Sequence, residues 1–246
     1  MQRIFPDHRA MDLSDLHAGL TLDAGEERAW LAIDMVTSLD GAATVDGRTD
    51  RLGGEADAVI FRQLRAAADA ILIGAGTVRA EGYGPGGGSA QRRADRESRG
   101  LAPRPRMVIV TGSLDLAPGH RVFSDPSHPP VVVTHGQASE ERGRALQDVA
   151  EVVRIGDDEV DLPALLHWLA AQGLRRVLCE GGPQLNGSLL DADLIDEVFL
   201  TVAPSAFAGG APRIAGSPRE IPDRDFTLRS VHEHDHELLL RYQRAR

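Results

Sequence analysis

The chain has 246 residues, of which 42% are hydrophobic, so it is long enough to bury the core of one large domain or two small ones. Acidic residues outnumber basic ones by 37 to 27, which argues against a nucleic-acid partner. The apolar runs are too short to span a bilayer. The N-terminal stretch is charged where a signal peptide needs an apolar segment. A single cysteine cannot form an intrachain disulfide. We therefore expect a cytoplasmic protein with no membrane partner.

Strands and helices are predicted to alternate along the chain. Helical spacing of apolar residues predicts helices over 55–68, about 138–148, 161–172 and after residue 182. Apolar and β-branched runs predict strands over 29–36, 70–74, 106–111, 130–134, 149–155, 175–179 and 196–203, and a closing hairpin over 225–243. This order indicates an α/β fold with a mostly parallel central sheet, helices on both faces and an antiparallel C-terminal hairpin.

Residues 82–104 interrupt this alternation. An unbroken glycine and proline run, 84–88, is followed by mixed charge without periodicity, which predicts a long, mobile loop. Because the strands before and after it look fully buried, we interpret the segment as an insertion within one sheet rather than as a linker. The predicted organisation is an N-terminal arm, residues 1–28, and a single domain, residues 29–246.

A pair of glycines and a proline separate a short strand from a helix in CEGGPQLNGSLL, residues 179–190. At such a turn the backbone N–H groups point outward and the helix dipole is positive, which favours an anionic ligand. Glu180 lies directly before the glycines. A carboxylate beside an anion site is locally unfavourable, so we expect Glu180 to have a use there.

A second glycine cluster follows the strand at 70–74, in ILIGAGTVRAEGYGP. Arg79 occupies the position of the third glycine in the dinucleotide fingerprint, and no Gly-Lys-Ser/Thr occurs in the chain, so neither a Rossmann nor a Walker loop is predicted. Each glycine turn alone could simply permit a tight bend. Two such turns, each closing a buried strand, are what a pyrophosphate-bearing cofactor needs.

Three motifs in this order resemble a known family. SLDG after the first strand, LRAAADAILIGAGTVRAEGY, and CEGGPQLNGSLLDADLIDEVFLTVAP followed by GG are similar to the reductase domain of riboflavin biosynthesis, over roughly residues 29–240. The resemblance implies a dihydrofolate-reductase-like fold. It also implies reduction of the ribosyl group of 5-amino-6-(5-phosphoribosylamino)uracil to ribityl with NADPH. The P-C-x-x-C half of the zinc deaminase found in bifunctional members is absent, so a stand-alone reductase is expected.

The resemblance further implies which residues bind the ligands. Substrate contacts would come from Ser38, Thr49, Arg65 and Glu180. Cofactor contacts would come from Arg51, Gly74, Gly76, Thr77, Glu81, Thr111, Ser113, Gly181, Gly182, Pro183, Gln184, Leu185 and Asn186. Asp40 and Glu180 are the candidate catalytic carboxylates, since either could bind ring N–H groups or steady a developing iminium, although Asp40 equally suits the corner of a turn. The resemblance and the apolar strand 198–202 also imply a homodimer.

Three functions remain open at this stage. The first is the pyrimidine reductase, and the second is a dihydrofolate- or pterin-type reductase on the same fold. A non-catalytic NADPH-binding protein is the third, because fold alone does not determine function. Arg65 suits bidentate capture of a phosphate or of a folate carboxylate, so it does not choose between the substrates.

The remaining polar and aromatic candidates have ordinary interpretations. Three histidines at 232, 234 and 236 are expected on one face of a strand, a spacing that can bind zinc, but no supporting partner is evident and no metal is predicted. Cys179 is expected to be a small core residue rather than a nucleophile. Trp30 and Trp168 are also expected in the core.

Overall fold

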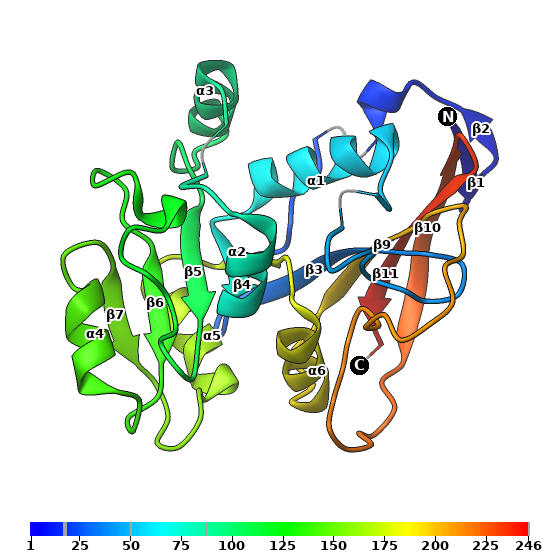
Figure 1. The fold of residues 1–246 in the computed structure, drawn as a ribbon. Coiled ribbons are helices and arrows are strands. Elements are labelled where there is room, and N and C mark those ends of the chain that lie inside the picture. Colours follow the sequence, from blue (N-terminus) through cyan, green and yellow to red (C-terminus); the bar gives the residue numbers. More distant parts are fainter. Residues whose placement is uncertain (17–18, 50, 87, 246) are drawn as a thin grey trace. The chain divides into compact units, whose positions relative to one another are not determined.

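The computed structural model describes residues 1–16, 19–49, 51–86 and 88–245 (Figure 1). The chain divides into two compact units. Unit 1 comprises Met1–Leu22, Leu31–Ala67 and Cys179–Arg246, and unit 2 comprises Asp23–Trp30 and Ala68–Leu178. The single domain expected over 29–246 stays a prediction. Within the described residues, none of the helices has the length and apolar character needed to cross a membrane.

Unit 1 is built on a sheet with the strand order β2-β1-β10-β11-β9-β3. Its strands are β1 (Gln2–Phe5), β2 (Arg9–Ala10), β3 (Trp30–Thr37), β9 (Glu197–Val202), β10 (Phe226–His234) and β11 (Glu237–Arg244). The helices of this unit are α1 (Glu55–Ala67), α6 (Pro183–Asp191) and the short 3-10 helix η1 (Leu13–Asp15). β3 and β9 are parallel, and the other neighbouring strands are antiparallel.

Unit 2 carries the parallel strands of the α/β pattern, in the order β8-β4-β5-β6-β7. Its strands are β4 (Ala70–Gly74), β5 (Arg106–Val110), β6 (Val131–Thr134), β7 (Glu151–Arg154) and β8 (Arg176–Cys179, whose last residue belongs to unit 1). The helices are α2 (Ala75–Glu81), α3 (Ala90–Ser98), α4 (Glu140–Leu146), α5 (Leu162–Ala171) and the 3-10 helix η2 (Arg121–Phe123). β4, β5 and β6 are almost wholly buried, as expected of central parallel strands. The predicted α/β class, with a mostly parallel sheet and antiparallel strands, is confirmed.

Two short strands of the N-terminal arm, β1 and β2, are part of the sheet of unit 1. β1 pairs antiparallel with β10, with Arg3 opposite His232, and β2 pairs with β1. No strand was predicted in this arm, because β1 is short and its pairing partner lies at the other end of the chain.

The closing hairpin forms where it was predicted, but its turn changes the interpretation of the histidines. Asp235 and His236 are the two loop residues, and both have positive φ, 48° and 70°. Two-residue hairpin loops favour this left-handed backbone, since it matches the strand twist. His236 therefore lies exposed in the turn, and its expected place on one strand face with His232 and His234 was wrong. Among the described residues, no group of three or more His, Cys, Asp or Glu could hold a metal ion.

The segment 82–104 contains a helix, so the expectation of a loop without secondary structure was wrong. Ser89 caps α3 by accepting a hydrogen bond from the backbone N–H of Arg92. The buried Arg96 side chain donates to the carbonyl oxygens of Ala68 and Ala102, each at 2.8 Å, which fixes the helix to the rest of unit 2. Gly87, in the glycine run, lies outside the described residues.

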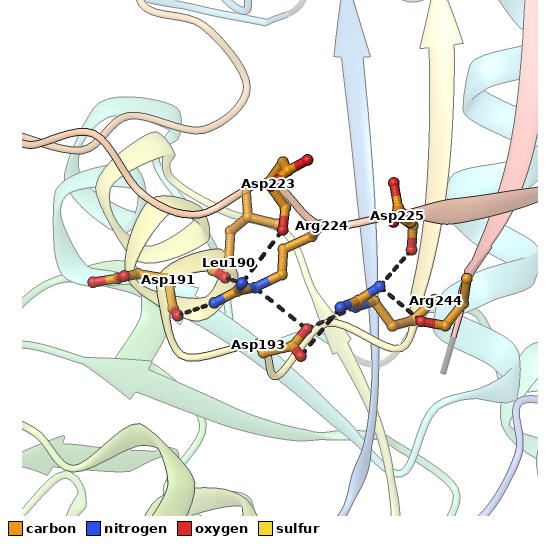
Figure 2. A network of polar contacts seen from close by, with 8 residues as sticks. Leu190, Asp191, Asp193, Asp223, Arg224, Asp225 and Arg244 are labelled. Atoms are coloured by element: carbon orange, nitrogen blue, oxygen red, sulfur yellow. Dashed lines mark hydrogen bonds and ion pairs between the residues drawn. The ribbon is translucent and has the colours of Figure 1, made fainter.

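Two arginines fasten the end of α6 to the C-terminal hairpin (Figure 2). Arg224 donates to the carbonyl oxygen of Asp191 at 2.8 Å. Arg244, at the end of β11, donates to the carboxylate of Asp193 at 2.7 Å and to the carbonyl of Asp225 at 2.7 Å. The C-terminal end of α6 is thus held by two arginines, one before β10 and one at the end of β11.

Candidate active site

The guanidinium of Arg65 and the carboxylate of Glu180 face each other in unit 1. Arg65 lies in the last turn of α1, and Glu180 follows β8 directly. Arg65 Nε and Nη2 each donate to one carboxylate oxygen of Glu180, both at 2.6 Å, and the guanidinium stacks over the Phe61 ring at 4.3 Å. Bidentate, charge-assisted contacts of this kind fix orientation as well as charge. This ion pair explains how a buried carboxylate is tolerated beside the glycine turn.

The glycine turn leaves the start of α6 open to an anion. Gly182 is the N-cap residue, Pro183 begins the helix, and no side chain of the described residues caps it. By contrast, α3, α4 and α5 are capped by Ser89, Ser139 and Asp161. The first N–H groups of a helix have no intrahelical partner, so an uncapped N-terminus suits a phosphate.

The inner side of this turn is closely packed. Gly181 has φ of +88°, and a Cβ there would lie 3.5 Å from Met35 Sδ. The buried Asn186 donates to the carbonyl of Ile214 at 2.8 Å and accepts from Cys179 Sγ at 3.4 Å. Of the residues predicted to bind the cofactor here, Leu185 and Asn186 are therefore buried within unit 1, whereas Gly182, Pro183 and Gln184 are accessible.

Asp40 is engaged by its own turn. Its carboxylate accepts from the Ser38 hydroxyl and from the backbone N–H groups of Phe207 and Ala208, at 3.2 and 2.6 Å. These hydrogen bonds, that of Ser38 first, lower the pKa of Asp40. The Ser38 hydroxyl also accepts from the N–H of Ala42 at 2.9 Å. The contacts favour the turn interpretation of Asp40, and they occupy Ser38 as well.

Thr49 and Arg51 lie in the loop between β3 and α1. Arg51 is exposed and pairs with the carboxylate of Asp46 at 3.0 Å. Thr49 is half-buried, and its carbonyl accepts from the N–H of Leu52 at 2.9 Å. Their predicted ligand roles stay predictions.

The other predicted cofactor residues meet at the carboxyl ends of two neighbouring strands of unit 2. Gly74 ends β4 and caps α2, which carries Gly76, Thr77 and Glu81, and Gly74 is in register with Val110 at the end of β5. Thr111 and Ser113 follow β5. Their hydroxyls accept from backbone N–H groups of the same turn, Thr111 from Leu114 at 3.0 Å and Ser113 from Asp115 at 3.3 Å. That this edge and the α6 turn form one cofactor site stays a prediction, since they belong to different units.

Asp34 is a candidate that the sequence analysis missed. It lies in the middle of β3, between Ile33 and Met35. Burial raises the pKa of Asp34 well above its usual range, the Asp57 and Glu180 carboxylates raise it further, and Arg65 opposes them. Burial also raises the pKa of Asp57, while its hydrogen bond with Thr201 lowers it. A charged residue inside an apolar central strand was the available signal, because acids are almost never buried without a partner or a use.

Comparison with known proteins decides the family. Residues 29–240 match the family described as the RibD C-terminal domain. The chain belongs to the RibD C-terminal domain family. The 2,5-diamino-6-ribosylamino-4(3H)-pyrimidinone 5′-phosphate reductase of Archaeoglobus fulgidus is 35% identical over 184 residues, which cover 74% of this chain and 83% of that protein. The riboflavin biosynthesis protein RibD of Mycobacterium tuberculosis is 32% identical over 174 residues, 70% of this chain and 41% of that protein.

A solved structure agrees with these relatives of the RibD C-terminal domain family. The pyrimidine reductase-like protein of Corynebacterium diphtheriae superposes with a TM-score of 0.79 at 26% identity, over 89% of this chain and 92% of that chain. The family and fold predicted from the three motifs are therefore confirmed. Together the relatives support a reductase in riboflavin biosynthesis.

Proposed function

We propose that this protein is an NADPH-dependent reductase that converts the ribosyl group of 5-amino-6-(5-phosphoribosylamino)uracil to a ribityl group. The observation that carries the proposal is the bidentate pair of Arg65 and Glu180 beside the uncapped N-terminus of α6. A carboxylate held in a fixed orientation, directly before a helix start without a side-chain cap among the described residues, supports this proposal in a chain of a reductase family.

The glycine turn at the start of α6 suits an anionic group of a dinucleotide. We assign the pyrophosphate to the turn at Gly182, Pro183 and Gln184, where Gly182 and Gln184 offer main-chain N–H groups, Pro183 has none, and no side chain of the described residues caps the helix. When bound, NADPH supplies the hydride, and the protein supplies placement and a polar environment.

Glu180 is the proposed ring-binding group. Its side chain is only 2% exposed, and Arg65 holds it by one hydrogen bond to each carboxylate oxygen. A pyrimidine ring can donate N–H groups to such a carboxylate. Because the fork of Arg65 faces Glu180, we propose that Arg65 acts by orienting this carboxylate rather than by capturing the substrate phosphate.

A second substrate is favoured by one specific observation. The Archaeoglobus relative, most of whose length this chain covers, is named for the diaminopyrimidinone rather than for the uracil. The two rings differ at one exocyclic position, and both carry the same ribosylamine and phosphate. The reaction at the ribosyl group would therefore be the same.

Steady-state NADPH oxidation with each pyrimidine, and with dihydrofolate, tests the proposal. We expect turnover with at least one phosphoribosylamino-pyrimidine and none with dihydrofolate, and slower turnover with NADH. Turnover with dihydrofolate alone would replace the proposal by a folate-type reductase. NADPH binding without any turnover would favour a non-catalytic binder.

We further propose that the protein is a cytoplasmic homodimer joined through the sheet of unit 1. In β9 the buried positions are Glu197, Phe199 and Thr201, while the alternating half-exposed positions are all apolar. The half-exposed or exposed apolar residues of this face are Val198, Leu200, Val202, Leu228, Val231, Leu238, Leu240 and Tyr242. An open sheet face ordinarily carries polar residues, so an apolar one supports a second subunit.

A further inference from the structure

Two basic side chains of unit 2 meet the loop that follows β5. Arg142 of α4 donates from Nη1 to the carbonyl oxygen of Ser113 at 3.0 Å. His135, the residue after β6, lies beside Gly112, because a Cβ on Gly112 would be 3.6 Å from His135 Nε2. Gly112 and Ser113 are neighbours in the chain, so the guanidinium and the imidazole flank one short stretch of backbone. This stretch lies at the carboxyl ends of the paired strands β5 and β6.

Contacts within the same edge orient these groups. His135 Nδ1 lies 3.2 Å from the carbonyl oxygen of Asp157, and a carbonyl only accepts, so Nδ1 is the donor. Nε2 is then the nitrogen beside Gly112, and it also donates when the ring is charged. The Ser113 hydroxyl accepts from the N–H of Asp115 at 3.3 Å, so its own proton can be donated to a ligand.

Most of the acids near this loop already have a partner. Three are engaged: Asp115 with Arg79, Glu140 with Arg154, and Asp158 with Gln137. Glu141 and Asp157 are exposed, and it is the carbonyl of Asp157 that contacts His135. In the part of the chain that the structure describes, no ion pair includes Arg142 or His135. Both basic groups are therefore left to act on an anionic ligand.

Gly112 leaves room for such a ligand. It is exposed, and its φ lies outside the left-handed region, so its backbone conformation does not require a glycine. A larger side chain would begin at a Cβ in contact with the imidazole and would cover Nε2. A guanidinium, an imidazole and a hydroxyl around this bare backbone suit a phosphate monoester, whose terminal oxygens can accept from all three.

We propose that Arg142, His135 and Ser113 bind a phosphate monoester over Gly112, and that this group is the 2′-phosphate of NADPH. The assignment rests on the proposed function and deepens it. NADPH and NADH differ only by this phosphate, so these residues would determine the choice between the two cofactors. The pyrimidine substrate carries the other phosphate monoester. The cofactor is favoured because open α/β sheets bind nucleotides at the carboxyl ends of their strands, where an arginine accommodates the 2′-phosphate.

Arg142→Gln is the decisive variant, with Arg144→Gln as its matched control. Both remove one positive charge from an exposed position of α4, but residues two apart lie on different sides of a helix. Calorimetric titration with NADP⁺ and with NAD⁺ measures affinity without turnover. We expect NADP⁺ affinity to fall roughly 10–100-fold in Arg142→Gln, the effect of losing a hydrogen bond to a charged group. It should change less than about threefold in Arg144→Gln, and NAD⁺ affinity should change less than about threefold in both variants.

His135→Gln and Gly112→Asp test the other side of the site. Glutamine can still form hydrogen bonds but carries no charge, so NADP⁺ affinity should fall about 3–10-fold. Gly112→Asp puts a carboxylate where the phosphate is expected and should lower NADP⁺ affinity at least about tenfold, while NAD⁺ is retained because an acid there can accept from the ribose 2′-hydroxyl. Gly119→Asp is the control, since Gly119 is exposed and a Cβ there would meet no atom within 4 Å.

Ribose 5-phosphate distinguishes the two sources of the phosphate. Weaker binding of ribose 5-phosphate to Arg142→Gln, with an unchanged ratio of NADP⁺ to NAD⁺ affinity, would overturn the cofactor assignment in favour of the substrate. If neither quantity changed, the phosphate site itself would be refuted. A parent that binds NAD⁺ as tightly as NADP⁺ would also overturn the assignment.

The same titrations separate this inference from the proposed function. A parent that prefers NADP⁺, loses that preference in Arg142→Gln and yet turns over no pyrimidine would support the phosphate site and refute the proposed reaction. A parent that turns over the pyrimidine while Arg142→Gln keeps its preference for NADP⁺ would refute the phosphate site alone. Binding of neither dinucleotide to the parent would overturn both.

Discussion

Arg65 and Glu180 are 115 residues apart in the sequence, and their side chains meet through two hydrogen bonds of 2.6 Å. The two partners are unequally buried, since the Arg65 side chain is 28% exposed and that of Glu180 only 2%. The buried carboxylate consequently needs the ion pair to compensate its charge, whereas the guanidinium is also partly hydrated.

Arg65→Ala should therefore destabilise the protein more than Glu180→Gln. The first variant leaves a buried carboxylate without its ion pair, which typically costs about 3–5 kcal/mol. The second leaves a neutral amide opposite a partly hydrated guanidinium, for which we expect about 1 kcal/mol. Urea unfolding of each variant measures the difference.

The exposed pair Arg106–Glu151, with side chains 25% and 52% accessible, is the control for this comparison. Arg106→Ala should cost less than about 1 kcal/mol, as exposed ion pairs usually do. Equal losses from Arg65→Ala and Arg106→Ala would contradict the role assigned to the buried pair.

Gly182→Val should remove NADPH binding without unfolding the protein. Gly182 has φ of −78°, which any residue adopts, so the substitution fills space at the phosphate turn rather than straining the backbone. We expect at least a tenfold loss of NADPH affinity by fluorescence titration. Gly181→Ala is the contrasting variant, because at φ of +88° it should cost about 1–2 kcal/mol of stability. Unchanged NADPH affinity in Gly182→Val would refute the phosphate assignment.

Asp34 should make the protein less stable as pH rises. Its pKa is raised in the folded state, so the folded protein holds a proton that the unfolded chain releases. Stability is then full below the unfolded pKa of about 3.9 and declines until pH passes the folded pKa. Asp34→Asn should remove this decline and raise Tm by about 2–4 °C at pH 8, the shift expected for roughly 1 kcal/mol.

Calorimetry of Asp34→Asn and the parent at pH 5 and pH 8 measures this effect. The gain should be larger at pH 8 than at pH 5. A gain that is larger at the lower pH would mean that the folded state favours the charged form of Asp34, contrary to the burial of this group.

The apolar sheet face predicts how the dimer can be broken. Leu200 and Leu240 are opposite each other on β9 and β11, and both are half-exposed. Replacing both with glutamate should yield a monomer by light scattering at micromolar concentration, because the charges would have to be buried without partners. Thr227→Glu, at an exposed position of β10, should leave the mass unchanged. A parent that is already monomeric would refute the dimer.

The parts of the fold that follow local patterns could be predicted from the sequence. β4 and β6 are short apolar runs between turn residues, and α1 has an acidic first turn and apolar residues at helical spacing. α3 could not be found this way, because Arg96 fixes it through the carbonyl groups of Ala68 and Ala102 and the helix has no apolar face. β1 was missed for a similar reason, since its partner β10 lies more than 200 residues away.

Some residues of the candidate site could likewise be predicted from a sequence motif, and others could not. Glu180 and Gly182 carry a visible motif, and the structure places both at the start of α6. The raised pKa of Asp34 depends first on its burial and then on the Asp57 and Glu180 carboxylates, which come from α1 and from the turn after β8. For Asp40 the motif is clear and suggested a catalytic role, but the contacts of its carboxylate are those of a turn.

Cys179, the only cysteine in the sequence, offers a probe of motion at the base of α6. Its side chain is fully buried, its thiol donates to Asn186, and burial raises its pKa to about 12. Thiol reagents attack the thiolate, so labelling requires this part of the chain to open first. The rate of labelling of the untouched wild-type chain therefore reports how often the α6 turn comes apart. A slower rate with NADPH present would show that the cofactor keeps it closed.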